Sequence, residues 1–332
     1  MKKVLSIAIP SYNVDKYLKE TLDSIANCKN LEYLNVLIID DGSQDKTGEI
    51  ADHYAQKYNP YITVIHKKNA GHGSTINTAL ENAKGTYFLV IDGDDWVDSE
   101  KLDSFLEFIQ TQDEDLIITG HYRNYILEGR EEKYFYREKK GFKCNLEYLL
   151  EKNYIIPMTD TCYKISLLRK IDLKIQENTF YVDEEFCSFP YQIIKSICFF
   201  GEGFYHYRIG DINQSISIEN SLRRITHKER VLENIYNILF LELEDKNREY
   251  ILRKLAGIAN SILMLHYVYQ SNKKEGRIRG KEYYKKIINN YKLLIPRCRR
   301  VNYIFYLMNI FSLGEKQWNL YQKLKYKLRR GE

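Results

Sequence analysis

The chain has 332 residues, of which 44% are hydrophobic and 29% are charged. This composition is close to that of an average globular protein, so it excludes disordered, collagen-like and low-complexity chains, and the length suffices for one large or two medium domains. The six cysteines form no Cys-x-x-Cys pair, and no apolar run approaches the ~18 residues of a spanning helix. We therefore expect a reduced, cytoplasmic protein without structural zinc that does not cross a membrane.

Charge is distributed unevenly along the chain, although the formal net charge is only +5. Residues 1–120 contain 11 Lys and Arg against 20 Asp and Glu, whereas residues 273–332 contain 17 against 4. A basic tail of this kind favours an acidic partner, either lipid headgroups, a nucleic acid or an anionic polymer.

The first 120 residues alternate short β-rich apolar runs with amphipathic helical segments, which is typical of a parallel sheet wrapped by helices. We therefore predict a doubly wound α/β fold with a mostly parallel sheet and helices on both faces. The expected strands are Val4–Ile9, Val36–Ile39, Ile62–Ile65, Tyr87–Ile91 and Leu116–Thr119. The expected helices between them are Asp15–Asn27, Asp45–Tyr58, Ser74–Lys84 and Ser99–Gln110.

The pattern changes after residue 120. β-like stretches at Tyr122–Leu127, Thr161–Tyr163 and Ile197–Phe200 accompany a predicted helix over Glu184–Lys195. Towards the C-terminus the pattern predicts helices, interrupted by a break at Ser271–Gly280. These helices are Leu222–Leu243, Arg248–Gln270, Lys281–Leu293 and Val301–Ile310.

Acidic residues follow two of the predicted strands. Asp40-Asp41-Gly42-Ser43 follows the second strand, and Asp92-Gly93-Asp94-Asp95 follows the fourth. In open α/β sheets ligands bind beyond the carboxyl ends of the strands, and five carboxylates gathered there would repel one another without a cation. Either motif alone is also a common turn sequence, but both at strand ends favour a metal-dependent site.

The two standard nucleotide-binding motifs are missing. Around Gly71 the sequence Gly-His-Gly-Ser-Thr-Ile lacks the third glycine of G-x-G-x-x-G, and no G-x-x-x-x-G-K-[ST] occurs. Hydride transfer and P-loop chemistry are therefore disfavoured, and we expect phosphates to be met by a metal held on carboxylates.

Four motifs in order resemble the inverting family 2 glycosyltransferases of GT-A fold. They are Ile7-Ala8-Ile9-Pro10-Ser11-Tyr12-Asn13, Ile39-Asp40-Asp41-Gly42-Ser43-Gln44-Asp45, Asn69-Ala70-Gly71 and Ile91-Asp92-Gly93-Asp94-Asp95. The resemblance is close over residues 1–105, thinner to about 215 and absent from the tail. It implies a GT-A catalytic domain over 1–215, with a nucleotide-sugar half at 1–120 and an acceptor half at 121–215, followed by a basic helical region at 216–332.

The resemblance also implies a donor site and a metal site. In the family the Pro-x-Tyr-Asn segment and the second Asp of Asp-Asp-Gly-Ser hold the base and ribose, which assigns those roles to Tyr12 and Asp41. The D-x-D motif binds ribose, sugar and a Mn²⁺ or Mg²⁺ ion, so Asp94 is the expected metal ligand, joined by the late histidine His206. The residues expected to bind the nucleotide sugar are Pro10, Tyr12, Asn13, Asp41, Asn69, Gly71, Asn77, Asp92, Gly93, Asp94, Asp95 and Arg208.

The groups that neutralise the diphosphate are less well defined. Arg208 is one candidate, because a guanidinium binds phosphate oxygens bidentately. Where many relatives read Ala-Arg-Asn, this chain reads Thr75-Ile76-Asn77, so the arginine of the family is missing. Which group replaces it stays open among Lys67, Lys68 and His72.

The family carries a catalytic carboxylate ahead of a helix in its acceptor half. The matching segment is Val182-Asp183-Glu184-Glu185-Phe186, with Val in place of the family's Glu. We therefore predict that Asp183 is the general base, with Glu184 as the alternative. An acidic helix N-terminus favoured by the helix dipole would give the same pattern.

The implied reaction is the transfer of a sugar from a nucleotide-diphosphate donor to a hydroxyl, with inversion at the anomeric carbon. The resemblance favours UDP, and the expected acceptor is a cell-surface glycan, a lipid-linked molecule or an anionic wall polymer. The alternative is a nucleic-acid or membrane-surface binding protein with a non-catalytic GT-A-like domain. The acidic strand ends would repel nucleic acid, so no nucleic-acid partner is expected.

The tail interleaves aromatic and basic residues in Ile295–Arg300, Tyr303–Met308 and Trp318–Arg330. It is compatible with peripheral contact at the anionic inner face of the plasma membrane, or with an anionic acceptor. A helical subdomain with a solvated basic face explains the same pattern, and the sequence leaves these interpretations open.

Overall fold

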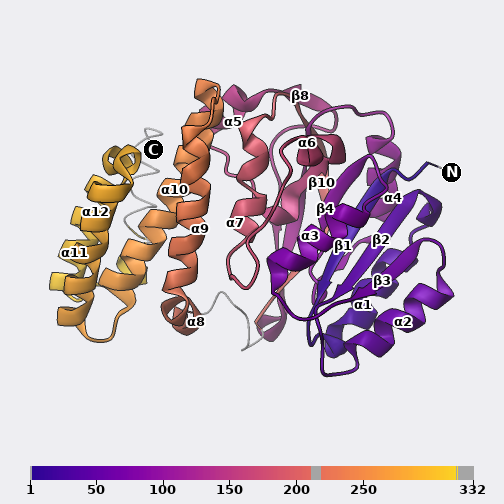
Figure 1. Ribbon diagram of the computed structural model, residues 1–332, viewed down its shortest axis with the longest axis horizontal. Helices are drawn as coiled ribbons and strands as arrows, with labels where there is room; N and C mark the ends of the chain where they lie inside the picture. The colour runs from indigo at the N-terminus through magenta and orange to yellow at the C-terminus, as the bar shows by residue number, and fades with distance from the viewer. Residues whose placement is uncertain (1, 211–217, 319, 321–332) are drawn as a thin grey trace. The chain divides into compact units, whose positions relative to one another are not determined.

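The computed structural model describes residues 2–210, 218–318 and 320. The chain divides into two compact units, which are described separately below and are drawn in Figure 1. The first unit is Met1–Gln214 with Glu242–Arg248, and the second is Ser215–Leu241 with Glu249–Glu332. The boundary predicted at residues 215 and 216 lies outside the described residues.

The N-terminal half of the first unit follows the prediction closely. Its four strands run parallel in the order β3-β2-β1-β4, and every residue of β1 and β2 is buried. Such continuous burial is expected of parallel strands covered on both faces. The strands are β1 Leu5–Ser11, β2 Leu34–Asp40, β3 Ile62–His66 and β4 Tyr87–Val90, and the helices are α1 Asp15–Ala26, α2 Thr47–Lys57, α3 His72–Asn82 and α4 Ser99–Ile109.

The remaining strands make the sheet mixed. Strand β9 (Thr161–Lys164) is antiparallel to both β4 and β6 (Leu116–Tyr125), while β10 (Ile197–Ile209) is parallel to β6. The predicted stretch at residues 122–127 is largely the continuation of β6, and β10 is far longer than its predicted four residues. Short strands complete the sheet: β5 Trp96–Val97 and β8 Phe142–Cys144 pair with β10, and β7 Arg130–Tyr134 pairs with β6.

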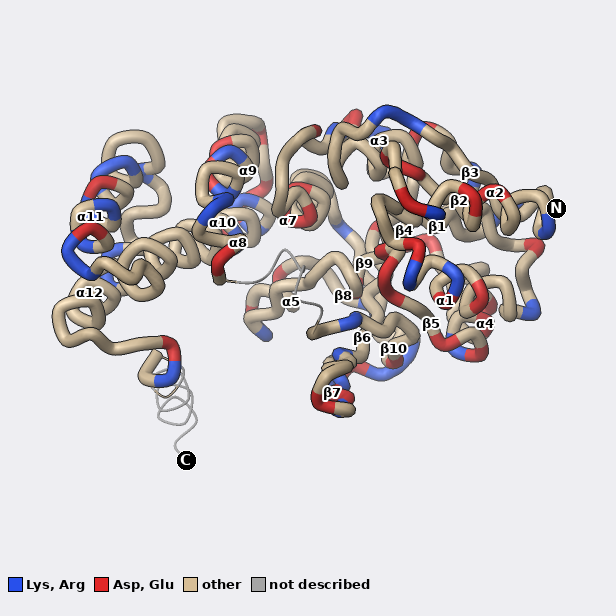
Figure 2. The backbone as a smooth tube through the Cα atoms, turned by 90° about the horizontal axis from the view of Figure 1, so that it is seen from below, with Lys and Arg blue, Asp and Glu red and all other residues tan. Residues whose placement is uncertain are grey.

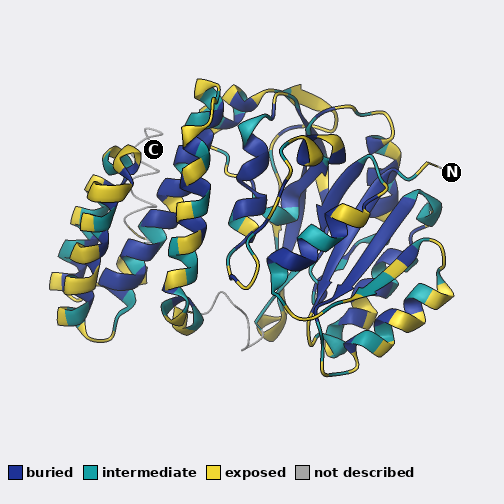
Figure 3. Ribbon diagram, in the orientation of Figure 1, coloured by how far each residue is buried: buried dark blue, intermediate teal, exposed yellow. Residues whose placement is uncertain are grey.

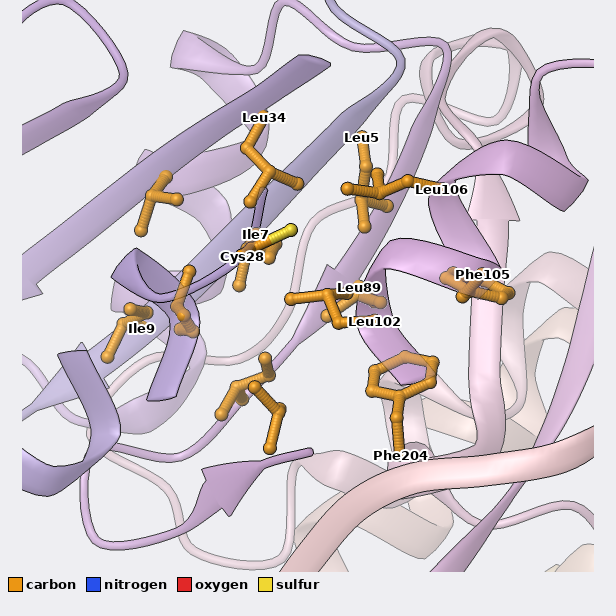
Figure 4. Packing of buried hydrophobic residues seen from close by; sticks show 14 of the residues in the cluster. Leu5, Ile7, Ile9, Cys28, Leu34, Leu89, Leu102, Phe105, Leu106 and Phe204 are labelled. Atoms are coloured by element: carbon orange, nitrogen blue, oxygen red, sulfur yellow. The ribbon is translucent and has the colours of Figure 1, made fainter. Parts of the chain in front are cut away.

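Alternation along the strands sends side chains into two layers. Leu89 of β4 belongs to the cluster that α1 and α4 bury against the sheet, together with Leu102 and Phe105 of α4 (Figure 4). The next residue back, Phe88, points to the opposite face and packs on Phe186, with ring centroids 6.2 Å apart. Figure 3 shows the central strands β1, β2 and β4 buried, whereas the surrounding helices expose one side. The strands β7 and β8 are mostly exposed.

The helix predicted over Glu184–Lys195 is wrong. The structure has a single helical turn, α7 (Asp183–Phe186), and a separate 3-10 turn, Phe189–Gln192. Pro190 explains the difference, because it cannot donate a backbone hydrogen bond and it disfavours a helical residue before it. Elements that the sequence pattern did not predict are α5 Leu146–Lys152, α6 Ile165–Lys170 and the 3-10 turns Leu31–Tyr33, Ile126–Glu128 and Met158–Asp160.

The second unit is helical, as predicted. It contains α8 Ile218–Arg223, α9 Ile225–Asn237, α11 Lys273–Asn290, α12 Ile295–Ile310, the 3-10 turns Ile238–Phe240 and Lys292–Leu294, and all but the first turn of α10 Asp245–Met264, which runs into a π-helix at Leu265–Tyr269. No described helix is long and apolar enough to span a bilayer.

The break predicted at Ser271–Gly280 is also wrong beyond its first two residues. The Asn272 side chain accepts hydrogen bonds from the backbone of Lys274 and Glu275 and so starts α11. The glycines that suggested a break lie inside α11, where a Cβ on Gly276 would come within 2.5 Å of the His266 carbonyl and one on Gly280 within 2.5 Å of the Tyr267 ring. They permit close packing rather than ending the helix.

The buried cluster around β4 allows a direct test of the fold. Replacing Leu89, which is 4% exposed, by alanine should lower the free energy of unfolding by roughly 2–5 kcal/mol, because a cavity opens between the sheet and α4. Urea denaturation followed by circular dichroism measures this change. Leu127→Ala, at a side chain 81% exposed, is the control and should stay within about 0.5 kcal/mol of wild type; equal effects would contradict the packing described.

Candidate active site

The strand-end motifs converge at the carboxyl end of β1. The backbone N–H of Asp41 donates to the Ser11 carbonyl at 2.9 Å, and that of Gly93 donates to the Pro10 carbonyl at 3.1 Å. A Cβ on Gly93 would lie 2.9 Å from the Pro10 oxygen, so only glycine allows the loop after β4 to approach β1 this closely. Residues from three separate motifs therefore share one edge of the sheet.

Asp41 organises the loop that follows β3. Its buried carboxylate accepts hydrogen bonds from the N–H groups of Ala70 (3.0 Å) and Gly71 (2.8 Å), and it pairs with the Lys67 ammonium at 2.9 Å. The carboxylate therefore fixes the backbone of the Asn69-Ala70-Gly71 segment, and Asn69 itself is exposed. The contact of Asp41 with the base or ribose stays a prediction.

Tyr12 and Asn13 occupy the mouth of this edge. The Tyr12 side chain is 51% exposed directly after β1. Asn13 has a left-handed backbone conformation (φ 52°). Its side-chain oxygen accepts a hydrogen bond from the Gln44 N–H at 2.8 Å, and its own N–H donates to the Ser43 hydroxyl at 3.1 Å. Asn13 thus holds the Asp-Gly-Ser turn, leaving the Tyr12 ring accessible to a ligand.

Asn77 connects α3 to a segment of the acceptor half. Its amide donates to the Ile175 carbonyl and accepts from the Ile175 N–H, both at 2.9 Å. Farther along the same segment, the Asn178 N–H donates to the Ala70 carbonyl at 2.6 Å. Asn77 therefore positions the chain that leads to Asp183, and its amide is directed at Ile175 rather than outward.

The D-x-D loop concentrates negative charge. Burial, reinforced by the charge of Asp92, raises the pKa of Asp94 to about 6. Asp95 is buried, and burial together with Asp94 and Asp92 raises its pKa well above the ordinary value. Asp95 accepts hydrogen bonds from the Tyr205 hydroxyl at 2.5 Å and the Arg208 N–H at 2.7 Å. Asp95 anchors the loop to β10, whereas the Asp94 carboxylate accepts no hydrogen bond from another side chain among the described residues.

His72 links this loop to the predicted base. Its Nε2 lies 2.9 Å from the Asp92 carboxylate. Burial lowers the pKa of His72, but the hydrogen bond to Asp92 and the charges of Asp92, Asp183 and Asp94 outweigh it and raise the pKa overall. Asp183, which is exposed at the first residue of α7, therefore acts on the same histidine as the D-x-D carboxylates.

Among the three groups considered for the missing arginine, the structure favours His72. Lys67 is held by Asp41, by the Lys68 carbonyl and by the Ser74 hydroxyl. Lys68 is exposed. Only His72 of the three contacts the D-x-D motif within the described chain. It lies in the first turn of α3, whose positive dipole end also favours an anion.

Arg208 supports the loop from the side of β10. Its Nε donates to the Asp94 carbonyl at 2.7 Å, its Nη2 pairs with Glu20 at 2.6 Å, and its guanidinium lies over the Trp96 ring at 4.6 Å. These contacts fix the backbone that carries Asp94. Diphosphate neutralisation by Arg208 stays a prediction.

The polar contacts of His206 among the described residues are with Asn124 and Glu131 rather than with Asp94, and its role as a metal ligand stays a prediction. Its ring is stacked between Trp96 (5.2 Å) and Tyr122 (4.4 Å). Neighbouring residues of a strand point to opposite faces, and Tyr205 and Tyr207 on either side are the ones within reach of the acidic cluster. The two tyrosines were missed, although their alternation with His206 was visible in the sequence.

The residues present fit a divalent cation only in part. Among the described residues, no three His, Cys, Asp or Glu side chains gather as a complete ligand set. Asp92 and Asp94 supply the carboxylate oxygens that Mg²⁺ and Mn²⁺ prefer. The two carboxylates repel each other, so a nearby positive charge would stabilise both. Two carboxylates alone would need further ligands from outside the described residues to hold a cation, and metal binding stays a prediction.

Comparison with known proteins identifies relatives of the chain. The sequence model for Glycosyl transferase family 2 matches residues 6–171. EpsJ of Bacillus subtilis (strain 168), an uncharacterized glycosyltransferase, is 28% identical over 242 residues, covering 71% of this chain and 67% of EpsJ. The glycosyltransferase GlyG of Streptococcus pneumoniae serotype 4 is 32% identical over 143 residues, covering 43% of this chain and 46% of GlyG.

A third relative also has a solved structure. TarS of Staphylococcus aureus, a poly(ribitol-phosphate) β-N-acetylglucosaminyltransferase, is 32% identical over 115 residues, which are 34% of this chain and 20% of TarS. The crystal structure of TarS 1–349 in complex with UDP-GlcNAc matches with a TM-score of 0.68 at 20% identity, covering 99% of this chain and 92% of that one. The likeness confirms the predicted GT-A fold.

The raised pKa of Asp94 predicts a gain of stability on its removal. Its pKa of about 6 exceeds the ordinary 3.8. Below about pH 4 Asp94 is protonated and does not destabilise the fold, and its ionisation lowers the free energy of unfolding as the pH rises through 6. Asp94→Asn removes that loss. In EDTA at about pH 7 the variant should exceed wild type in free energy of unfolding by roughly 1–3 kcal/mol, and the two should converge near pH 4.

Urea denaturation across this pH range measures the difference. Asp113→Asn is the control, because a hydrogen bond from Lys164 lowers the pKa of that exposed carboxyl, and its removal should bring no gain at pH 7. A difference for Asp94→Asn that does not vary with pH would contradict the electrostatic argument.

Proposed function

The chain belongs to glycosyl transferase family 2, and from this premise we propose that it transfers a sugar from a UDP-sugar to an acceptor hydroxyl with inversion at the anomeric carbon. The observation that carries the proposal is the convergence of Asp92 and Asp94 with Asp183 around His72. The reaction needs stabilisation of a departing diphosphate and a base for the attacking hydroxyl, and the site offers groups for both tasks.

The donor is proposed to lie across the carboxyl ends of β1, β2 and β4. The exposed Tyr12 ring offers a stacking surface for the base, and the loop held by Asp41 lies beside it, with Asn69 exposed. The relative TarS, whose crystal structure contains UDP-GlcNAc, supports a UDP-sugar as the donor.

Asp92 and Asp94 would hold the divalent cation, with oxygens of the diphosphate completing its ligands. When bound, such a cation supplies positive charge to the leaving diphosphate. The chain's own contribution is His72, which is placed at the N-terminus of α3 with a raised pKa. In its protonated form the imidazolium donates hydrogen bonds and attracts phosphate oxygens, which is the task of the missing arginine.

Asp183 is proposed to accept the proton of the attacking hydroxyl. It is exposed at the beginning of α7, whereas Glu185 two residues later is buried and accepts a hydrogen bond from the Gln176 N–H at 2.8 Å. The buried Glu185 fixes the turn, and Asp183 is exposed at its start, on the side from which an acceptor would approach. A single displacement with a general base needs no covalent nucleophile.

The proposed acceptor is a hydroxyl of a cell-surface glycan or a wall polymer, either free or linked to lipid. The name of TarS, which acts on poly(ribitol-phosphate), supports an anionic wall polymer. A non-catalytic GT-A-like binding protein would have no need of the three carboxylates that converge here, so the transferase is favoured.

A nucleotide screen tests the donor and the metal together. Thermal unfolding would be followed with UDP, GDP, CDP and dTDP, each in Mn²⁺, in Mg²⁺ or in EDTA. UDP with a divalent cation should raise the melting temperature, since ligand at 100 times its Kd stabilises by about 2.7 kcal/mol. The shift should disappear in EDTA and in Asp94→Ala. If RNA or anionic vesicles shift the transition and no nucleotide does, the transferase proposal fails.

The base is tested by a matched pair of variants. Asp183→Asn should lower the rate of sugar transfer by roughly 10²–10⁴-fold, because the amide cannot accept the hydroxyl proton, while the UDP-dependent thermal shift stays at the wild-type value. Glu184→Gln, one residue away, should retain activity. Loss of transfer in Glu184→Gln with activity kept in Asp183→Asn would make Glu184 the base.

A further inference from the structure

One face of α12 is exposed and changes character along its length. Cys298, Phe305, Met308 and Asn309 bury the opposite face within the helical unit. At 100° per residue, the exposed stripe falls within about 120° of the helix circumference. It begins with Pro296, Arg299 and Arg300, continues through Tyr303, and ends with Ile310 and the following Phe311.

The basic end of the stripe forms a cleft with α11. Its volume is about 560 Å³, and none of its lining side chains is acidic. Arg299 lines this cleft together with Tyr284 of α11, and its positive charge opposes the rise that burial causes in the pKa of Tyr284. The lining residues are Tyr284, Pro296, Arg299, Arg300, Asn302 and Tyr303. Guanidinium groups bind phosphate oxygens bidentately, so a cleft whose lining includes two arginines and two tyrosines suits a phosphate group.

The other end of the stripe is apolar and faces solvent. Ile310 is 44% exposed, Phe311 68% and Leu313 37%. Tyr303, at 62% exposure, lies between the apolar end and the arginines, where an amphipathic ring suits the boundary of a bilayer. Membrane binding of a surface helix combines burial of apolar side chains with attraction of basic side chains to anionic lipids, and this face of α12 carries both kinds of group at successive positions along its length.

The charge of the surroundings complements an anionic surface. Residues 273–311, which contain α11 and α12, hold 11 Lys and Arg against two Glu and no Asp, as the predominance of blue on these helices in Figure 2 indicates. A soluble anionic polymer would use these charges, but it would leave the apolar end uncovered. An anionic bilayer offers headgroup phosphates to the basic end of the stripe and acyl chains to its apolar end.

We propose that α12 docks the protein on an anionic phospholipid bilayer, with a lipid phosphate in the cleft of Arg299 and Arg300 and with Ile310 and Phe311 inserted among the acyl chains. The docking does not depend on sugar transfer, and it gives the peripheral contact predicted for the basic tail a defined surface. Binding is electrostatic at one end of the helix and hydrophobic at the other.

Co-sedimentation with vesicles tests the docking. The full chain should bind vesicles of phosphatidylglycerol and phosphatidylcholine but not vesicles of phosphatidylcholine alone. The double variant R299A/R300A should weaken binding by roughly 10- to 30-fold, since each basic residue contributes about fivefold near an anionic surface. I310S/F311S should weaken binding comparably, and its residual binding should vanish at high salt, because only the screened charges remain.

Matched controls separate this surface from general charge and hydrophobicity. K139A/K140A removes two consecutive exposed cations of the other unit, and I126S/L127S removes two consecutive exposed apolar residues; both should bind vesicles like wild type. Circular dichroism verifies folding of every variant. Equal losses in the controls, or no binding of wild type to anionic vesicles, would overturn the proposal.

The source of the phosphate is distinguished by competition. A soluble poly(glycerol phosphate) should displace the protein from vesicles weakly, and inorganic phosphate should not displace it. If the soluble polymer binds as tightly as vesicles, and if I310S/F311S leaves both affinities unchanged, the cleft serves a soluble anion and membrane docking is refuted. Nucleotide-dependent thermal shifts are a separate readout, so failure of the docking leaves the transferase proposal standing.

Discussion

The site depends on the cost of placing three carboxylates within four residues at the end of a buried strand. A single residue separates the end of β4 from the segment that contains Asp92, Asp94 and Asp95, and burial together with their mutual repulsion raises the pKa values of Asp94 and Asp95. A loop of this composition cannot be stable in isolation, because each charge disfavours the ionisation of the others. The neighbouring elements therefore donate hydrogen bonds that hold this loop in place.

Two layers of the fold offset the repulsion in different ways. From β10, Tyr205 and the backbone of Arg208 donate to Asp95, and the Arg208 side chain holds the Asp94 carbonyl. From α1, the Thr21 hydroxyl donates to the carbonyls of Gly93 and Asp95. These contacts fix the loop and partly satisfy Asp95. They leave the Asp94 carboxylate without a side-chain donor among the described residues, so its charge is available to a cation.

The sequence predicted the N-terminal half well because its signals are local. Strands β1 to β4 are short apolar runs between periodic helices, and the strand-end aspartates mark the ligand-binding edge. The failures came where one residue overrides a pattern. Pro190 divides an apparently helical stretch, and the glycines of α11 serve close packing. The face of the sheet on which His206 lies depends on how its side chain alternates with its neighbours along β10, and a sequence motif alone does not specify that face.

Asp41 and Asp94 show why the same residue type at two strand ends has different consequences. The Asp41 carboxylate is nearly inaccessible and already accepts two backbone N–H groups and a lysine ammonium. A cation brought to it would have to displace donors that hold the loop, and little free energy would be gained. Within the part of the chain that the structure describes, no other side chain donates to Asp94, which is stabilised by its own backbone N–H and bears the repulsion of Asp92. Attraction for a cation is therefore concentrated at the D-x-D loop, where His72 and Asp183 also meet.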